Sequence, residues 1–313
     1  MAHGPSGGHQ AYYVPESSKL PIFATVGLGC TILGAANTLN HIKAGTGGMS
    51  WLLPVGFAFF IFVLWQWFAT TIRENMAGLN NAQLKRSYVM GMQWFIFSEV
   101  MFCFAFFFAL AYVRMLAVPW LGGLGDRGAS NQLWTGFAAN WPMMQTPQEA
   151  VEASGGAQLM AKNATYIAAK EVVDWKTIPL LNTALLVTSS VTVHFAHTAL
   201  KAGKRQALTL WLLATLALGF VFVGFQAVEY HHAYTELGLT LASGIYGSTF
   251  FLLTGFHGFH VCLGAVMLTV MFLRATTKGH FTPEDHFGFE AASWYWHFVD
   301  VVWICLFLFV YIL

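Results

Sequence analysis

The chain has 313 residues, of which 57% are hydrophobic and only 9% are charged, and its mean hydropathy is +0.57. Soluble globular proteins carry about 25% charged residues, so too few charges remain here to cover a water-facing surface. The formal net charge of +1 provides no global field that would attract nucleic acid. The composition therefore indicates a membrane protein and argues against a nucleic-acid partner.

Seven apolar stretches are long enough to cross a membrane, because a hydrocarbon core about 30 Å thick needs roughly 20 apolar residues in a helix. The chain is thus predicted to be an all-α integral membrane protein with seven transmembrane helices. A polar tail, residues 1–19, precedes the first stretch, which lacks the basic start and cleavage site of a signal peptide. In chain order the predicted spans are Pro21–His41, Trp51–Ile72, Tyr88–Val118, Ile178–Leu200, Ala207–Tyr230, Leu241–Leu273 and Phe289–Leu313.

The connections between the spans are short, with one exception. Residues 119–176 begin with Gly-rich turns and continue into a polar stretch containing Ala, Glu and Lys, which is predicted to form one short interfacial helix. The third and sixth spans are longer than a bilayer requires, so we expect them to tilt or to project beyond the membrane. No internal repeat is evident by inspection, which argues against a transporter built from repeated halves.

The basic residues of the short connections predict the orientation. Cytoplasmic loops carry an excess of Lys and Arg, and here one side receives nearly all of them while the other receives essentially only Lys43. The N-terminus is therefore predicted to lie in the cytoplasm and the C-terminus on the opposite side. The residues on the predicted cytoplasmic side are Lys19, Arg73, Lys85, Arg86, Lys201, Lys204, Arg205, Arg274 and Lys278.

Glu99 lies near the centre of the third span, where an ionised side chain costs roughly 2.5–3.5 kcal/mol on insertion scales. It must be protonated, paired or directed into a polar cleft. His257 and His260, three residues apart on one face of the sixth span, are candidate partners. Two interpretations remain open for Glu99: a proton or lipid-contact site, and a protonated acid that hydrogen-bonds to a neighbouring helix.

The membrane histidines do not form a recognisable metal site. At about 1.5 Å per residue, His260 lies roughly 20 Å from the predicted cytoplasmic end of its span and His297 roughly 12 Å from its own end, so their depths match poorly for a pair of haem ligands. His194 and His197 offer only another pair three residues apart. A haem or metal site is one interpretation of His257 and His260, and we favour the other, histidines hydrogen-bonded to partners such as Glu99.

The last span contains three more ionisable residues. His297 and Asp300 share one face and are predicted to form a structural polar pair, with a proton relay as the alternative. Glu290 stands at the start of the helix, where the positive end of the dipole tolerates an acid, and we interpret it as structural. Four cysteines, in four different spans and with no paired spacing, are interpreted as small apolar residues: Cys30, Cys103, Cys262 and Cys305.

Five segments, in order along most of the chain, together resemble subunit III of the haem-copper cytochrome c oxidases. The last two are long and unusual, so chance similarity explains them poorly. The segments are FSEVMF around Glu99, IPLLNTALL from Ile178, GFQAVEY ending at Tyr230, YGSTFFLLTGFHGFHV from Tyr246 and HFGFEAASWYWHFVDVVW from His286.

The resemblance implies one membrane domain, residues 1–313, in which helices I–II (20–75) and helices III–VII (87–313) form a two-helix and a five-helix bundle. A lipid-filled, V-shaped cleft would separate the bundles. The chain itself would hold no haem, copper or other metal; haem and copper would belong to partner subunits, and the chain would hold bound phospholipids. The direct partner would be subunit I, with subunit II in the same complex and cytochrome c as the substrate of that complex.

Four positions at the predicted cytoplasmic ends of the second and sixth spans resemble the family's lipid-contacting positions: Arg73, Arg274, Lys278 and His280. Cationic donors at the membrane interface suit anionic headgroups, although positive-inside topology and snorkelling side chains explain the same residues. Three departures limit the resemblance. Asn80 and Asn81 stand where many relatives carry histidines, Ser243 stands where relatives often have an acid, and the external connection is longer than in the shortest members.

We therefore expect an accessory, non-catalytic subunit III of a proton-pumping cytochrome c oxidase in a bacterial inner membrane, with a mitochondrial inner membrane as the alternative. It would stabilise the catalytic subunit, support proton uptake and hold phospholipid near the oxygen entry route. The rival interpretations are a quinol oxidase subunit III, a proton-coupled transporter using Glu99, His257 and His260, and a membrane cytochrome.

Overall fold

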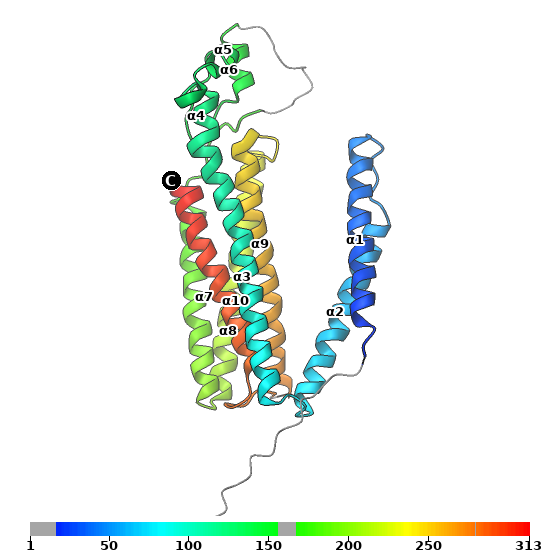
Figure 1. Cartoon of the computed structure of the whole chain (residues 1–313). Coiled ribbons are helices and arrows are strands. Elements are labelled where there is room, and N and C mark those ends of the chain that lie inside the picture. The colour runs from blue at the N-terminus through cyan, green and yellow to red at the C-terminus, as the bar shows by residue number, and fades with distance from the viewer. Residues whose placement is uncertain (1–16, 156–166, 279) are drawn as a thin grey trace, which may run out of the picture. The chain divides into compact units, whose positions relative to one another are not determined.

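The computed structural model describes residues 17–155, 167–278 and 280–313. Within these ranges all regular structure is helical, and seven helical spans are long and apolar enough to cross a membrane, which confirms the predicted fold class (Figure 1). The long helices are α1 (Leu20–Lys43), α2 (Leu52–Met76), α3 (Ala82–Tyr112), α7 (Ile178–Lys201), α8 (Arg205–Thr235), α9 (Gly244–Leu273) and α10 (Phe287–Leu306).

Three of these helices continue into π-helical turns, and the spans differ in length. The third span, α3 together with a π-helical segment and the short helix α4 (Val118–Leu121), covers 40 residues, and the sixth covers 33. At 1.5 Å per residue the third is about 60 Å long, twice the thickness of a hydrocarbon core. The predicted excess length of both spans is thus confirmed. The fifth span, α8, is also long at 31 residues.

The chain divides into two compact units, residues 1–90 and 91–313. In the first unit α1 and α2 form a helical hairpin with glycines at the helix contact. A Cβ built on Gly34 would collide with the backbone of Leu53, and one on Gly56 would lie 2.7 Å from the Thr31 nitrogen. Small residues let membrane helices approach this closely and gain dispersion contacts where lipid provides no hydrophobic driving force.

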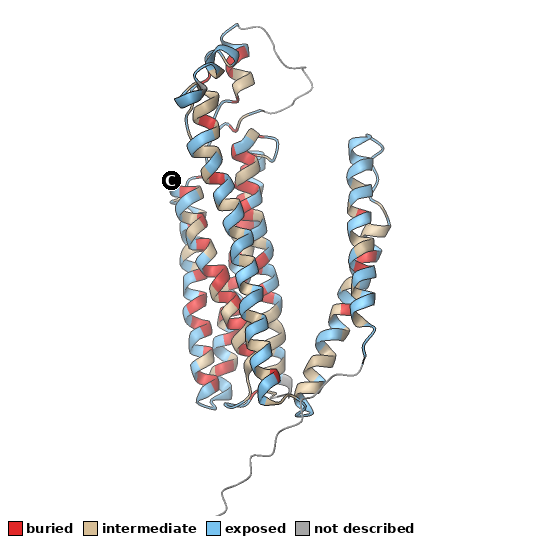
Figure 2. Ribbon diagram, viewed as in Figure 1, coloured by how far each residue is buried: buried red, intermediate tan, exposed pale blue. Residues whose placement is uncertain are grey.

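In the second unit most of the buried residues belong to α7, α8, α9 and α10, whose ribbons carry many of the buried positions in Figure 2. Trp296 of α10 is fully buried, and its ring fits against two glycines: a Cβ on Gly219 of α8 would lie 2.7 Å from this ring, and one on Gly264 of α9 would lie 2.9 Å from it. The indole N–H donates to Ser189 Oγ of α7 at 2.9 Å. One side chain therefore connects four helices.

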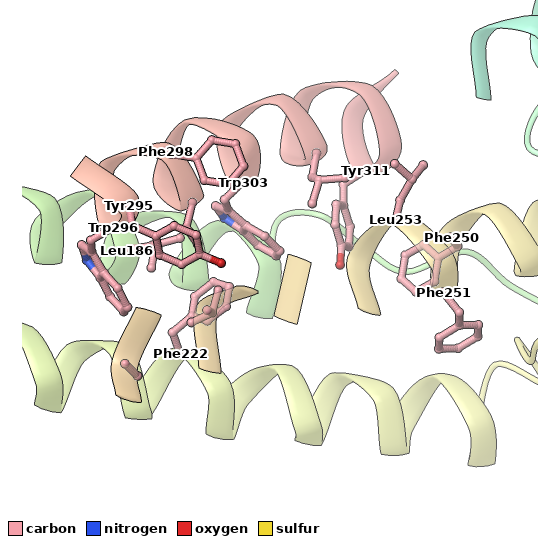
Figure 3. Packing of buried hydrophobic residues seen from close by; sticks show 14 of the residues in the cluster. Leu186, Phe222, Phe250, Phe251, Leu253, Tyr295, Trp296, Phe298, Trp303 and Tyr311 are labelled. Atoms are coloured by element: carbon pink, nitrogen blue, oxygen red, sulfur yellow. The ribbon is translucent and has the colours of Figure 1, made fainter. Parts of the chain in front are cut away.

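A second tryptophan on α10 repeats this arrangement. Trp303 donates its indole N–H to Thr183 Oγ1 of α7 at 3.0 Å and packs edge-on against Phe222 of α8, with ring centroids 4.8 Å apart. Figure 3 shows Trp296, Trp303 and Tyr311 extending from the last span toward α8. The polar tips of these aromatic rings find partners within the protein, as groups without access to water require.

The long connection between the third and fourth spans contains a short helix, α6 (Pro147–Ala153), in the polar stretch where one is predicted. A capping box begins it: Thr146 Oγ1 accepts from the Glu149 N–H at 3.2 Å, and the Thr146 N–H donates to Glu149 Oε2 at 2.7 Å. The connection is also bonded to the bundle, because the Lys170 N–H donates to the Leu237 carbonyl at 2.9 Å. The described part of the connection that follows residue 166 is therefore held to the segment that follows α8.

Candidate functional site in the five-helix unit

The structure brings Glu99 of α3 together with His260 of α9. Glu99 Oε2 lies 2.9 Å from His260 Nε2, while the other ring nitrogen, Nδ1, donates to the Phe256 carbonyl of the preceding turn at 2.6 Å. The glutamate side chain is 23% exposed and the histidine side chain 7%. The acid in the third span thus has a partner on a neighbouring helix.

The contacts of His260 define how many protons the pair holds. A carbonyl oxygen only accepts, so Nδ1 must carry a hydrogen. In the neutral tautomer Nε2 then carries a lone pair and no hydrogen. A short contact between Nε2 and Glu99 Oε2 therefore requires a proton on the carboxyl group. The alternative is an imidazolium beside a carboxylate. In either form one proton lies between Oε2 and Nε2.

His257, the other candidate partner of Glu99, lies in a different environment. Its ring contacts Phe222 and Trp303 at centroid distances of 5.9 and 5.0 Å. It is 2% exposed, and neither ring nitrogen has a hydrogen-bond partner. Of the two histidines, the one at 260 makes the contact with the acid.

The ring of His297 hydrogen-bonds to a side chain of another helix. Its Nδ1 lies 3.0 Å from Ser190 Oγ of α7. Asp300, on the same helix as His297, is 7% exposed, and its Oδ1 has no hydrogen-bond partner. The pairing of His297 with Asp300 stays a prediction.

The cationic positions predicted to contact lipid are in different places. Arg73, in the first unit, is exposed and bonds within its own helix, donating to the Ala69 carbonyl at 3.3 Å and to Thr70 Oγ1 at 3.1 Å. Arg274 is half-buried at the end of α9, and the His280 N–H donates to its carbonyl at 3.3 Å. The side chain of Lys278 lies outside the described part of the structure.

The guanidinium of Arg274 has a distinctive environment. Its Cζ lies 4.6 Å from the Phe281 ring centroid, and a Cβ on Gly288, at the start of α10, would lie 3.1 Å from Nη1. Its Nε is buried without a hydrogen-bond partner. The arginine thus brings a positive charge beside the N-terminal turn of a helix, where free N–H groups favour an anion.

Two of the positions that depart from the family pattern have local structural roles. Asn81 caps α3, because its Oδ1 accepts from the Leu84 N–H at 2.8 Å. Ser243 closes the turn before α9: its Oγ accepts from the Thr240 N–H and donates to the Gly238 carbonyl, each at 2.9 Å.

Sequence reasoning did not identify Glu229, a buried acid of α8. Its Oε1 accepts from the Tyr311 hydroxyl at 2.6 Å, and the residue is 2% exposed. Its position inside an apolar run was the available signal, the same one that singled out Glu99. Its partner follows it by many residues, so sequence spacing could not have supplied the pair.

Sequence reasoning also missed a group formed by His197 of α7, His286, which immediately precedes α10, and Glu290 of α10. One potential ligand atom from each lies within 4.8 Å of the others. Local spacing pairs His197 only with His194 on its own helix and identifies Glu290 only as an acid at a helix start. The group forms because the end of α7 meets the beginning of α10.

The fold and these contacts define a multi-pass helical membrane protein in which several polar side chains of the spans, among them Glu99, His297 and Glu229, have partners on other helices. The family model described as cytochrome c oxidase subunit III matches residues 9–125 and 164–313. The chain belongs to the cytochrome c oxidase subunit III family.

Curated relatives agree with the family model. The protein named cytochrome c oxidase subunit 3 from Arabidopsis thaliana is 35% identical over 302 residues, covering 96% of each chain. Its counterpart from Carassius auratus is 35% identical over 307 residues, covering 97% of this chain and 98% of the relative. These relatives are subunits of a respiratory oxidase, and a non-catalytic subunit fits the family.

Proposed function

We propose that this chain is the accessory, non-catalytic subunit of a proton-pumping cytochrome c oxidase. It binds subunit I directly and shares the complex with subunit II, while cytochrome c is the substrate of the whole complex. In this role it stabilises the catalytic subunit, supports proton uptake and holds phospholipid near the route of oxygen entry. The rival transporter and quinol oxidase functions gain no specific support from the contacts of the described residues.

The observation that carries this proposal is the uncovered apolar surface of the third span. In its most apolar stretch only 6% of residues are buried, against 44% in the last span. Large side chains there are exposed, among them Trp94, Phe97, Phe104 and Phe108. An apolar helix that the other helices of its own unit do not cover needs lipid or other protein around it, as an accessory membrane subunit would have.

The test is to purify the oxidase with and without this chain and to follow oxygen consumption over many turnovers. We expect the initial turnover rate to remain near that of the intact complex, because the reacting groups lie elsewhere. The rate should then decay faster without the chain. Complete loss of initial turnover in a complex whose haem content is normal would contradict the proposal.

We further propose that the chain holds no redox cofactor. The Nδ1 of His260 is engaged by the Phe256 carbonyl and its Nε2 by Glu99, so His260 itself has no free nitrogen to ligate haem iron while these bonds last. The visible absorption spectrum of the isolated chain tests this. We expect no haem band, and stoichiometric haem or copper in the isolated chain would overturn the statement.

The surroundings of Arg274, whose carbonyl accepts from the His280 N–H, support a phospholipid site. Arginine can bind a phosphate group through two parallel hydrogen bonds, and here the guanidinium lies beside the start of α10 with its Nε unpartnered. We expect Arg274→Gln to lower the acidic phospholipid that purifies with the complex by about one molecule per chain. Mass spectrometry of extracted lipids measures this.

Lys204→Gln is the matched control for Arg274→Gln, because Lys204 is an exposed cation at the same end of the five-helix unit. It should leave the lipid content unchanged. If the wild-type and Arg274→Gln complexes assemble normally and contain the same amount of acidic phospholipid, Arg274 does not bind that lipid.

For localisation we propose a bacterial inner membrane, with the N-terminus in the cytoplasm and the C-terminus in the periplasm. The distribution of Lys and Arg supports this orientation. The relatives from plants and animals fit a mitochondrial inner membrane as the alternative. Fractionation of the source cells distinguishes the two.

A further inference from the structure

Three side chains from two helices and one connection meet where α7 ends and α10 begins. His197 Nε2 and His286 Nε2 each lie 3.4 Å from the same atom, Glu290 Oε1. The two imidazole ring centroids are 5.5 Å apart. Two ring nitrogens therefore face a single carboxylate oxygen.

The nitrogens that face Glu290 lack satisfactory hydrogen bonds. Both Nε2 atoms are buried, and neither makes a hydrogen bond. The side chain of His286 is only 10% exposed, so water does not readily replace the missing partner. A buried polar atom without a hydrogen bond costs about 1–3 kcal/mol. Two such nitrogens beside one carboxylate oxygen therefore indicate that a ligand binds between the three atoms.

The other nitrogen of His286 shows what kind of ligand this is. Its Nδ1 donates to the Thr282 carbonyl at 3.1 Å, and because a carbonyl only accepts, the neutral ring has its lone pair on Nε2. Metal-bound histidines usually donate their second N–H to a carboxylate or a backbone carbonyl, which fixes the tautomer and the ring orientation. His286 already has this arrangement.

We propose that His197, His286 and Glu290 bind a divalent transition-metal ion of the zinc type. Ligand atoms about 2.0–2.1 Å from a tetrahedral zinc lie about 3.3 Å from one another, and both histidine–glutamate distances are 3.4 Å. Two imidazoles and one carboxylate form a common zinc ligand set, with water as the fourth ligand. Glu290, 28% exposed, leaves a side open for that water and for entry of the ion.

The proposed ion would join the end of α7 to the beginning of α10. Lys201, an exposed residue one turn beyond His197, reduces the attraction for a cation, so we expect moderate affinity. Zinc has no redox chemistry, so this site adds no electron-transfer centre. It does depart from the expectation, drawn from the sequence, that the chain binds no metal.

The test uses the full-length chain in detergent, stripped with a chelator and titrated with Zn²⁺ against a chromophoric competitor. We expect one zinc ion per chain and a rise in the midpoint of thermal unfolding, since an ion that binds only the folded state stabilises it. Mutating a residue that only hydrogen-bonds a metal ligand typically weakens metal binding 10- to 100-fold. His286→Gln removes a ligand itself, so zinc affinity should fall by at least that much. It should also abolish the thermal shift.

His194→Gln is the matched control, because His194 is an exposed histidine one turn earlier on the same helix. It should bind zinc like the wild-type chain. Should His286→Gln fail to fold, Glu290→Gln, which keeps the size of the side chain, serves as the second variant. Absence of stoichiometric zinc in the wild-type chain, or equal affinity in the wild-type chain and either site variant, would overturn the proposal.

Discussion

Among single residues, Glu99 and His260 show how the protein keeps an acid within a membrane span. An ion pair there would have to compensate for the lost hydration of two charges, and in a low-dielectric environment the attraction often does not suffice. A protonated Glu99 that donates to the lone pair of His260 avoids both charges. In that neutral form the contact of Nδ1 with the Phe256 carbonyl places the lone pair of the ring on Nε2, where it can accept the proton of the carboxyl group.

Replacing Glu99 distinguishes a structural acid from a proton carrier. Glu99→Gln retains the shape and supplies an N–H for His260 Nε2, so we expect assembly and initial oxygen reduction near those of the wild type. Glu99→Ala leaves Nε2 without its partner, which costs about 1–3 kcal/mol, and should reduce assembly or shorten the working lifetime of the enzyme. The measurements are the yield of complex, its turnover rate and its inactivation rate.

The comparison of the two variants contains its own control, because both lack the carboxyl group and only Glu99→Gln retains a hydrogen-bond donor. If Glu99→Gln stops turnover in a fully assembled complex, the carboxyl group is an obligatory proton carrier. That result would contradict the accessory role proposed for this residue.

At the scale of helices, the sequence predicted every span, and the errors lie at the ends. Hydropathy finds the part of a helix in hydrocarbon and does not report its polar extensions. The third span was predicted from Tyr88, whereas the helix begins at Ala82, because Asn81 caps it and its first turns carry Lys85 and Arg86. The fifth span continues past Tyr230 for a similar reason, through the polar residues that end at Thr235.

The contacts between helices were less accessible to sequence reasoning than the helices themselves. The acid in the third span required a partner, so Glu99 was singled out, and two histidines three residues apart were equally suitable. Only the rotation of α9 about its axis distinguishes them, and packing against other helices sets that rotation. The group of His197, His286 and Glu290 was missed because no local spacing connects its members.

The contact of Trp296 with two glycines predicts a large effect from a very small substitution. Gly219→Ala places a methyl group 2.7 Å from the buried indole ring, and overpacking of this kind costs about 1–3 kcal/mol. Gly224→Ala on the same helix is the control, since nothing lies within 4 Å of the new carbon. Unfolding of the chain in mixed detergent micelles should show lower stability for Gly219→Ala alone.

A smaller aromatic ring should relieve that strain. Trp296→Phe removes the outer atoms of the indole that the new methyl group meets, so the double variant Gly219→Ala, Trp296→Phe should lose less stability than the two single losses added together. Strict additivity would mean that the two side chains do not meet in the folded protein.

At the scale of the whole chain, basic residues gather at one end of the five-helix unit. The end of α7, the beginning of α8 and the end of α9 lie together at the lower end in Figure 1. These helix ends include Lys201, Lys204, Arg205 and Arg274. Such an excess is retained on the cytoplasmic side during insertion, so the arrangement predicts which end of the unit faces the cytoplasm.

Labelling of single cysteines in membrane vesicles tests this orientation. In a chain whose four native cysteines are replaced by alanine, Ala202→Cys lies in the exposed turn between α7 and α8, and Ala242→Cys lies in the exposed turn before α9, at the opposite end. A maleimide that cannot cross membranes should label position 242 in right-side-out vesicles and position 202 only in inverted ones, because the basic end stays in the cytoplasm. Detergent should make both accessible. Labelling of position 202 in sealed right-side-out vesicles would reverse the orientation, and with it the side from which zinc would reach the group formed by His197, His286 and Glu290.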